Sequence, residues 1–167
     1  MPLMIIASLM IVLVLKESPF FTQLRTGQYK APFRIFKFKT MSSNPKGEET
    51  MTPLTKQLRR LGFDELPQLF NVLLGEMSLV GPRPLPIGYL SIIRPQHHLI
   101  YQVKPGITGL CQVSGGSALS WGKRFDYDMA YVAQASFKLD FRILFRTVQI
   151  VLGRTKSDSH EKLSEGY

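Results

Sequence analysis

The sequence predicts an α+β protein that is mostly helical, and three observations support this class. Residues 2–15 are almost continuously apolar, which favours a helix. Residues 33–39 alternate apolar and basic side chains, as a short strand does. Residues 119–152 predict helices, and the last of these repeats apolar side chains at helical spacing. With 167 residues, the chain is long enough for one modest domain with its own core.

Charge and cysteine content narrow the range of partners and environments. The chain carries 21 Lys and Arg against 12 Asp and Glu, a net charge of +9, which points to a nucleic acid, an anionic membrane surface or a phosphorylated substrate. Cys111 is the single cysteine, so it cannot form an internal disulfide; a small core residue is its plainest interpretation. The sequence has no P-loop and no Rossmann glycine pattern, and its histidines are not spaced as zinc ligands.

The apolar residues 2–15 would form a helix about 20 Å long, which is short of the roughly 20 residues that cross a bilayer. A helix that is hydrophobic on every side needs cover on every side. A segment that enters the membrane without crossing it is therefore favoured over a buried core helix. We expect a membrane-embedded helix over residues 1–18, because Pro19 breaks it, and a catalytic domain over residues 19–154.

The next elements are short. Residues 33–39 predict a strand or one arm of a small β-hairpin, with Lys37 and Lys39 on one face. Residues 42–53 are polar and predict a loop without a domain boundary. Residues 54–61 predict a short basic helix.

A further helix is predicted over residues 65–74. Asp64 is a good N-cap residue, and Pro67 falls in the first turn, where a missing N–H costs little. Gly75 is a natural stop after the last helical residue. Residues 80–86 contain three prolines and a glycine, which predict turns.

Towards the C-terminus, residues 89–101 predict helix on either side of Pro95, and residues 104–109 predict a rigid turn. The last helix is amphipathic, so it either lies in a membrane interface or packs on the core as an ordinary surface helix. A polar tail follows over residues 155–167. The apolar face of the last helix comprises Phe141, Leu144, Phe145, Val148 and Leu152, and its basic stripe comprises Lys138, Arg142 and Arg146.

Asp64 and Glu65 form an acidic pair in a strongly basic chain, and two compatible interpretations stand side by side. In the first, Asp64 caps a helix and Glu65 meets the positive end of its dipole. In the second, the pair does phosphate chemistry, because a carboxylate can attack phosphorus and its neighbour can hold Mg²⁺.

Phosphate chemistry also needs fixed cations. Arg83 lies between Pro82 and Pro84, which restrict the backbone and help to aim the guanidinium group. Arg59 precedes Asp64 by five residues, although simple solvent exposure is an equal alternative for it.

Several stretches, in order, resemble the bacterial sugar transferase family, the monotopic phosphoglycosyl transferases that act on polyprenyl phosphate. The segment "DELPQLFNVLLGEMSLVGPRPL" is similar to the family signature, and the resemblance covers nearly all of residues 2–152. The other matching stretches are "QLRTG", "KFKTM", "KPGITGLCQV", the series Trp121, Phe125, Asp128 and Tyr131, and "FKLDFRILFRTVQIVL".

This resemblance implies transfer of a phosphosugar from a UDP-sugar to undecaprenyl phosphate, with release of UMP, at the cytoplasmic face of the bacterial inner membrane. It implies that Asp64 is the nucleophile, that Glu65 helps to bind Mg²⁺, and that Arg59 and Arg83 contact substrate phosphates. It also implies that residues 1–18 are the second half of a re-entrant helix. Such a protein starts a surface polysaccharide, a lipopolysaccharide or another glycoconjugate, and nucleic acid is not an expected partner.

The chain also departs from the family pattern. Pro2 matches the proline at the centre of the re-entrant element, so the first half of that element is absent; a misplaced start and a truncated form are both open. Gly116 and Lys39 stand where relatives carry arginine. Two alternatives therefore remain: a truncated, non-catalytic, membrane-associated paralogue and a basic nucleic-acid-binding protein. The sugar, the pathway and the oligomeric state are not encoded in these motifs.

Overall fold

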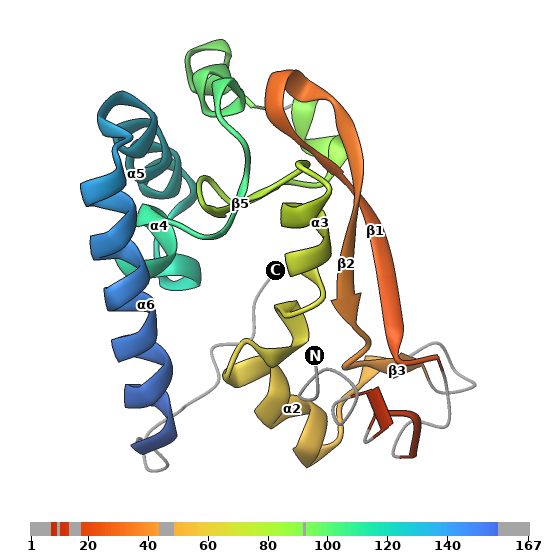
Figure 1. Ribbon diagram of the computed structural model, residues 1–167. Helices are drawn as coiled ribbons and strands as arrows, with labels where there is room; N and C mark the ends of the chain where they lie inside the picture. Colours follow the sequence, from red (N-terminus) through yellow and green to blue (C-terminus); the bar gives the residue numbers. More distant parts are fainter. Residues whose placement is uncertain (1–7, 10, 14–17, 44–48, 92, 157–167) are drawn as a thin grey trace.

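The computed structural model describes residues 8–9, 11–13, 18–43, 49–91 and 93–156 (Figure 1). A long β-hairpin and the helix α3 form one side of the molecule, and the helices α5 and α6 form the other. A short two-stranded sheet lies between these two sides. The predicted α+β class with a small hairpin is confirmed.

The hairpin consists of β1 (Phe20–Thr26) and β2 (Pro32–Phe38), which pair antiparallel along their whole length. Phe20 and Phe38 lie opposite each other at its open end, and their rings stack with centroids 5.6 Å apart. The turn between the strands is a short 3₁₀ helix, η1 (Gln28–Lys30). The strand predicted over residues 33–39 is therefore one arm of this hairpin.

The loop predicted over residues 42–53 is partly paired. Its ends form the two-residue strands β3 (Ser42–Ser43) and β4 (Glu49–Thr50), which pair antiparallel. The basic helix follows as α2 (Pro53–Arg60), as predicted. Thr52 caps its N-terminus, and the side chains of Thr52 and Thr55 satisfy each other's backbone N–H groups.

The helix predicted over residues 65–74 is shorter, and the N-cap assignment of Asp64 is wrong. The helix α3 runs over Gln68–Leu73, so it begins after Pro67 and has no side-chain cap. Asp64 lies one turn earlier, inside the 3₁₀ helix η2 (Phe63–Glu65). Pro67 lacks an N–H group, so the backbone bonding pattern restarts at this point. The predicted stop is confirmed, because Gly75 follows α3 with a φ of +80°.

The turn predicted over residues 104–109 contains a strand. The strand β6 (Gly106–Thr108) pairs parallel with β5 (Ser78–Val80), far away in the sequence. Gly81 continues this contact, because its N–H donates to the carbonyl of Thr108 at 2.9 Å. A Cβ atom on Gly81 would overlap the carbonyl oxygen of Lys104, so glycine permits the close approach of the two chains.

Between and after these strands the chain forms short helical turns. The 3₁₀ helices η3 (Ile87–Ser91) and η4 (Pro95–Gln102) confirm the helical stretches predicted on either side of Pro95. The four-residue helix α4 (Leu110–Val113) and the 3₁₀ helix η5 (Gly116–Ala118) follow β6. Cys111 is buried in α4, which confirms its interpretation as a small core residue.

The predicted C-terminal helices are α5 (Trp121–Gln134) and α6 (Phe137–Lys156). Their inner faces meet β5 and α4 in the largest core cluster. The hydroxyl group of Tyr131 links these elements, since it lies 3.2 Å from the carbonyl oxygen of Val80 and 2.9 Å from Oδ1 of Asp140. The buried members of the cluster are Val80, Val113, Tyr131 and Ile143.

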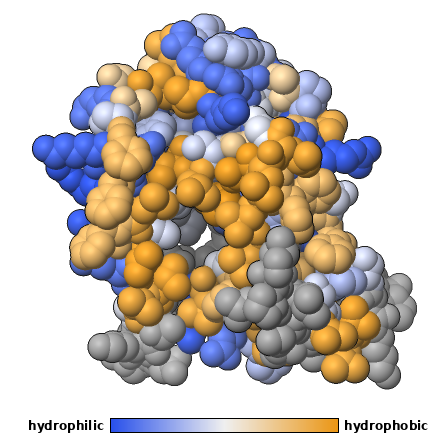
Figure 2. Space-filling model, viewed as in Figure 1, coloured by the Kyte–Doolittle hydropathy of each residue, from blue (hydrophilic) through white to orange (hydrophobic). Residues whose placement is uncertain are grey.

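The apolar face predicted for α6 meets the core only in part, since Leu144 packs against the cluster that contains Ile143. Ile143 is only 2% exposed, whereas Phe141 is 66% exposed and Phe145 is 61% exposed. Figure 2 shows aromatic side chains along one edge of an apolar face that continues across the centre of the molecule. The predicted apolar face of α6 therefore lies largely on the surface.

Of the N-terminal segment, residues 8–9 and 11–13 are described and are helical. Ile11 is fully buried and packs in a cluster with Phe38, Leu58 and Leu66. The rest of the predicted membrane-embedded helix, and residues 157–167 of the predicted tail, lie outside the described residues. Within the part of the chain that is described, no helix is both long and apolar enough to cross a bilayer.

Candidate functional site

Glu65 is the centre of the site. Its Oε1 atom lies 2.8 Å from Nζ of Lys37 and 3.0 Å from Nη2 of Arg83. These cations come from the hairpin and from the Pro-Arg-Pro turn, so three separate parts of the chain meet at one carboxylate oxygen. The second oxygen of Glu65, Oε2, takes part in neither ion pair.

Asp64 precedes Glu65 and is buried, with 7% of its surface exposed. Burial raises the pKa of its carboxyl group to about 6, and the charge of Glu65 adds to this effect. Lys37 and Arg59 act in the opposite direction. Asp64 is therefore a carboxyl group of raised basicity that is still mostly ionised at pH 7.

The two neighbouring carboxyl groups differ in their ionisation. Burial also acts to raise the pKa of Glu65, but Arg83 and Lys37 outweigh it and hold this pKa below its ordinary value. Glu65 is thus kept ionised by two cations, whereas Asp64 has no direct ion pair among the described residues. Environments that push two adjacent pKa values apart are typical of catalytic acid and base pairs.

The local fold places these carboxylates for identifiable reasons. Gly62 adopts a φ of +74°, which ends α2 and turns the chain into η2. Asn71 in α3 is fully buried, and its side chain holds the hairpin against this turn. Its Oδ1 accepts a hydrogen bond from the N–H of Phe36 at 3.0 Å, and its Nδ2 donates to the carbonyl of Arg34 at 2.7 Å. Lys37, the next residue along β2, is positioned by this connection.

Arg25 on β1 holds the turn that carries Arg83. Its Nη1 donates to the carbonyl of Pro84 at 3.2 Å, and its backbone forms an isolated bridge with Pro86. Burial lowers the pKa of Arg25, and the like charge of Arg83 lowers it further. Two guanidinium groups close to each other attract an anion, so this end of the site favours phosphate oxygens.

Arg59 lies at the end of α2 with an exposed side chain. Its Nη1 points towards sulfur, 3.2 Å from Sδ of Met41. It lies close enough to Asp64 to lower the pKa of that carboxyl group. The structure thus brings both predicted arginines to the acidic pair. Arg83 contacts the pair directly, and Arg59 acts on it through the electrostatic effect of its charge.

Asp128 on α5 is a second buried carboxyl group, with 7% of its surface exposed. Burial raises its pKa to about 7, and Arg83 opposes that shift. Its Oδ1 has no hydrogen-bond partner among the described residues. The site therefore extends from the acidic pair, through Arg83, towards α5.

Sequence reasoning about chemistry did not assign roles to Lys37, Arg25 or Asn71. The alternating pattern of β2 placed Lys37 on one face of a strand, but not against Glu65. The position of Asn71 could have indicated a structural role. A polar residue among the apolar residues of a helix is expected to have specific hydrogen-bond partners when it is buried.

The acidic pair suits Mg²⁺ only in one binding mode. Among the described residues, no group of three or more His, Cys, Asp or Glu side chains gathers around one point. Mg²⁺, however, is commonly held by one or two carboxylates together with substrate phosphates and water. The two adjacent carboxylates, with Oε2 of Glu65 outside both ion pairs, fit this mode.

The chain is similar to known proteins over most of its length. A family model described as bacterial sugar transferase matches residues 1–154. The chain is 46% identical over 140 residues to the uncharacterised sugar transferase EpsL of Bacillus subtilis, covering 80% of this chain and 69% of that protein. It is 37% identical over 168 residues to a UDP-glucose:undecaprenyl-phosphate glucose-1-phosphate transferase of Caulobacter vibrioides, covering 90% and 63%.

A third relative is much longer than this chain. The undecaprenyl-phosphate galactose phosphotransferase of Salmonella typhimurium is 41% identical over 109 residues, which is 65% of this chain but 23% of that protein. The chain therefore spans only part of several relatives that it matches.

Proposed function

This chain belongs to the bacterial sugar transferase family, and on that premise we propose that it transfers a sugar phosphate from a UDP-sugar to undecaprenyl phosphate and releases UMP. The named relatives from Caulobacter and Salmonella act on undecaprenyl phosphate, which supports this acceptor. The observation that carries the proposal is the acidic pair itself. Asp64 is buried and has a raised pKa, and the neighbouring Glu65 forms ion pairs with two cations. The product would begin the synthesis of a polysaccharide.

In the first step, a carboxylate oxygen of Asp64 attacks the phosphorus that carries the sugar. A new bond forms between Asp64 and this phosphorus, and the bond from the phosphorus to the bridging oxygen breaks. The bridging oxygen leaves with the electron pair as part of UMP. The product is an acyl phosphate that links Asp64 to the sugar phosphate.

In the second step, a phosphate oxygen of undecaprenyl phosphate attacks the same phosphorus. The bond between Asp64 and the phosphorus breaks, and Asp64 recovers its carboxylate. The sugar is then joined to the lipid through a diphosphate. No oxidant or further co-reactant is needed, and the two steps use one nucleophile.

The cations of the site have separate roles in this proposal. Arg83, with Arg25 behind its turn, faces the negative charge that gathers on UMP as it leaves. Lys37 keeps Glu65 ionised and lowers the pKa of Asp64, which maintains the nucleophile as a carboxylate at neutral pH. Arg59 has a weaker electrostatic effect on the site, because its side chain is exposed and its charge is screened by solvent and salt.

Glu65 would hold Mg²⁺ together with the substrate phosphates, which is the mode that the two carboxylates fit. When bound, the ion would neutralise charge on the phosphate oxygens. The protein's own part is to keep Glu65 ionised, and the ion pairs with Lys37 and Arg83 do so.

We place the protein at the cytoplasmic face of the bacterial inner membrane. The exposed apolar residues of α6 and the basic stripe beside them support an interfacial position for that helix. The alternative of a non-catalytic paralogue is not favoured, since the acidic pair and its cations are all present. The nucleic-acid alternative has no specific observation in its favour.

The test is UMP release from a panel of UDP-sugars, with undecaprenyl phosphate and Mg²⁺, using the full chain in lipid nanodiscs. We expect turnover that is lost in Asp64→Ala and kept in Asp126→Asn, a matched change of an exposed acid on α5. Without acceptor, mass spectrometry should find a sugar phosphate on the peptide that contains Asp64. Turnover retained in Asp64→Ala would show that Asp64 is not the nucleophile.

A further inference from the structure

A small cavity of about 10 Å³ lies beside the Pro-Arg-Pro turn, and the end of β1 and the helix η4 form the rest of its wall. Its volume is close to the least space that holds one water molecule, roughly 10–15 Å³. The cavity is therefore too small for a substrate and the right size for a single water molecule. The residues that line it include Thr26, Arg83, Tyr101 and the prolines Pro82, Pro84 and Pro105.

Two buried hydroxyl groups belong to the wall of this cavity. Thr26 is 1% exposed and Tyr101 is 6% exposed. Neither Oγ1 of Thr26 nor the hydroxyl oxygen of Tyr101 has a hydrogen-bond partner among the residues that the structure describes. Burial raises the pKa of Tyr101, so its hydroxyl group is neutral at pH 7 and has a proton to donate. Buried hydroxyl groups in folded proteins are nearly always bonded to protein or to ordered water.

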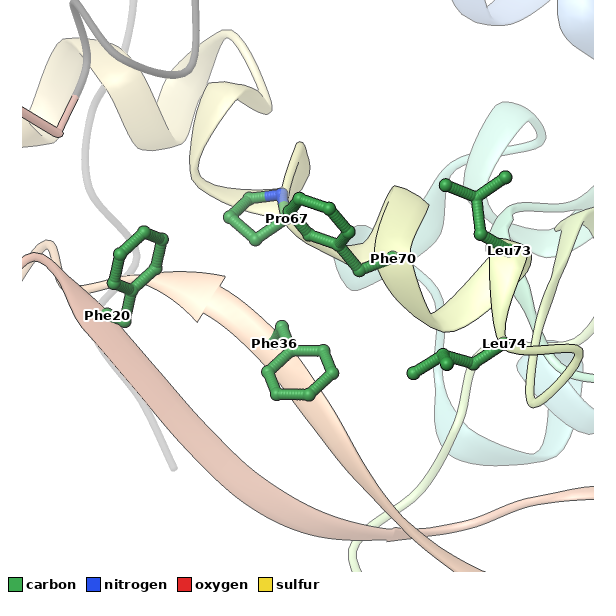
Figure 3. A pocket seen from close by; sticks show the side chains of 6 residues that line it. All are labelled: Phe20, Phe36, Pro67, Phe70, Leu73 and Leu74. Atoms are coloured by element: carbon green, nitrogen blue, oxygen red, sulfur yellow. The ribbon is translucent and has the colours of Figure 1, made fainter. Parts of the chain in front are cut away.

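A larger groove, of about 330 Å³ between the hairpin and α3, has the opposite character. Figure 3 shows Phe36 of β2 pointing towards α3, with Phe20 at one end of the groove and Leu73 and Leu74 at the other. No side chain in its wall can orient a polar ligand, whereas the small cavity offers two hydroxyl groups and a guanidinium group. The side chains of the groove are Phe20, Phe36, Pro67, Phe70, Leu73 and Leu74.

The turn beside the cavity is held from the side of β1 by hydrogen bonds. The backbone N–H of Thr26 donates to the carbonyl of Leu85 at 2.9 Å, and Nη1 of Arg25 donates to the carbonyl of Pro84 at 3.2 Å. On its other side the turn adjoins η4, which contributes Tyr101 to the cavity. The cavity thus lies where η4 could support the same turn.

We propose that one ordered water molecule occupies this cavity and bonds to the hydroxyl groups of Thr26 and Tyr101, which makes Tyr101 a positioning residue for Arg83. An ordered water molecule takes about two to four polar partners. The two hydroxyl groups are two of them, and Arg83, which also lines the cavity, is the third. The role of Arg83 rests on the proposed function, whereas the water site itself does not.

Arg83 needs such support because its own side chain is poorly enclosed. Its side chain is 49% exposed, yet its Nη2 lies 3.0 Å from Oε1 of Glu65. A half-exposed arginine side chain samples many conformations unless its surroundings restrict it. The water molecule would restrict Arg83 and its turn from the side of η4, as Arg25 and Thr26 do from the side of β1.

The water site is tested by urea unfolding of the full chain in detergent micelles. Thr26→Val and Tyr101→Phe each remove one hydroxyl group and nearly keep the volume of the side chain, and the double variant completes a cycle. Tyr29→Phe is the matched control, because it removes a hydroxyl group from a tyrosine that is 76% exposed. Thr26→Ser keeps the hydroxyl group and controls for changes at that position.

We expect each hydroxyl deletion to lower the ratio of folded to unfolded protein about fivefold, as loss of one hydrogen bond does. The double variant should lose less than the product of the two, because both hydroxyl groups bond to one water molecule. Tyr29→Phe should keep the wild-type ratio. A ratio that stays the same or rises in Thr26→Val or in Tyr101→Phe would mean a dry cavity, and simple multiplication would mean that no water is shared. Either result would overturn the proposal.

The positioning role is tested by UMP release in nanodiscs. We expect Tyr101→Phe to lower kcat/KM for the UDP-sugar about fivefold in the wild-type background and to have no further effect when Arg83→Gln is already present. Thr26→Ser should keep the wild-type kcat/KM, since its hydroxyl group remains. An equal loss with and without Arg83 would mean that Tyr101 does not act through this arginine. That result would overturn the positioning role and leave the proposed function standing, because turnover would continue.

A direct readout covers the case in which no sugar is turned over. A crystal structure of the full chain should show electron density for one water molecule at hydrogen-bond distance, about 2.5–3.0 Å, from Oγ1 of Thr26 and from the hydroxyl oxygen of Tyr101. This density would support the water site even if the proposed function fails. A dry cavity, or a direct bond between the two hydroxyl groups, would overturn it.

Discussion

Nζ of Lys37 lies 2.8 Å from Oε1 of Glu65, so an ion pair joins the β-hairpin to the turn that carries Asp64. Both side chains are largely buried, at 17% and 18% exposed, and the pair is therefore screened less by salt than a surface pair. One lysine on the hairpin thus fixes Glu65 directly and acts on the ionisation of Asp64.

Replacing Lys37 by methionine should move the acid limb of the pH–rate profile to higher pH. Lys37 lowers the pKa of Asp64, so its removal raises that pKa above its present value of about 6. The nucleophile is then protonated at a higher pH, and a limb moved by about one unit lowers kcat/KM about tenfold in the acid range. The measurement is UMP release between pH 5 and pH 8. Lys123→Met, an exposed lysine on α5, is the control; a limb that stays in place in Lys37→Met would contradict the prediction.

Asp64→Asn should stabilise the fold while abolishing turnover. The pKa of Asp64 is raised by burial, so ionising it costs folding free energy: the folded state holds the proton more tightly than the unfolded chain does. This cost is absent below pH 4, grows as the pH rises from about 4 to about 6, and is fully present at pH 7. The neutral variant should gain about 1–2 kcal/mol over the wild type at pH 7.

The check for Asp64→Asn is urea unfolding at pH 7 and at pH 4. The gain in unfolding free energy should disappear at pH 4, because the wild-type carboxyl group is then largely neutral in the folded state. Asp126→Asn should show no comparable gain at pH 7, since that side chain is exposed. An equal gain at both pH values would mean that ionisation of Asp64 is not the cause.

Asn71→Ala should destabilise the fold by about 2–4 kcal/mol. The variant would leave the N–H of Phe36 and the carbonyl of Arg34 without the partner that Asn71 supplies, and it would leave a small cavity at the fully buried position of Asn71. Thermal or urea unfolding measures this loss. Gln134→Ala, at an exposed position near the end of α5, should change stability by less than about 0.5 kcal/mol. A similar small change in Asn71→Ala would show that the amide does not hold the hairpin.

Arg25→Lys should raise the KM for the UDP-sugar about tenfold with little loss of stability. Lysine keeps the charge but loses the planar fork that reaches the carbonyl of Pro84, so the turn that carries Arg83 is held less firmly. Steady-state UMP release separates KM from kcat, and Arg34→Lys on the same hairpin is the matched control, because its side chain is exposed. A KM equal to that of Arg34→Lys would mean that Arg25 does not position this turn.

The local sequence was enough to predict elements whose signals lie close together in the chain. The alternation in residues 33–39 predicted a hairpin arm, the basic stretch over residues 54–61 predicted α2, and residues 119–152 predicted the helices α5 and α6. The resemblance to a family, read from ordered motifs, selected Asp64 and Glu65 as the chemical centre. The predicted elements are confirmed because neighbouring residues decide backbone propensity and periodicity, whereas the role of Asp64 and Glu65 stays a prediction.

The tertiary structure alone decided what those residues contact. The parallel pairing of β5 with β6 joins segments that are far apart in the sequence, and no local sequence pattern predicted it. Asp64 was expected to cap α3, but Pro67 restarts the backbone bonding after η2, and the buried Asp64 has a raised pKa instead. Lys37 and Arg83 meet at Glu65 only because the hairpin and the Pro-Arg-Pro turn pack on either side of it. Sequence determines which groups are available for chemistry, whereas burial and long-range packing set their charge, because both depend on residues distant in the chain.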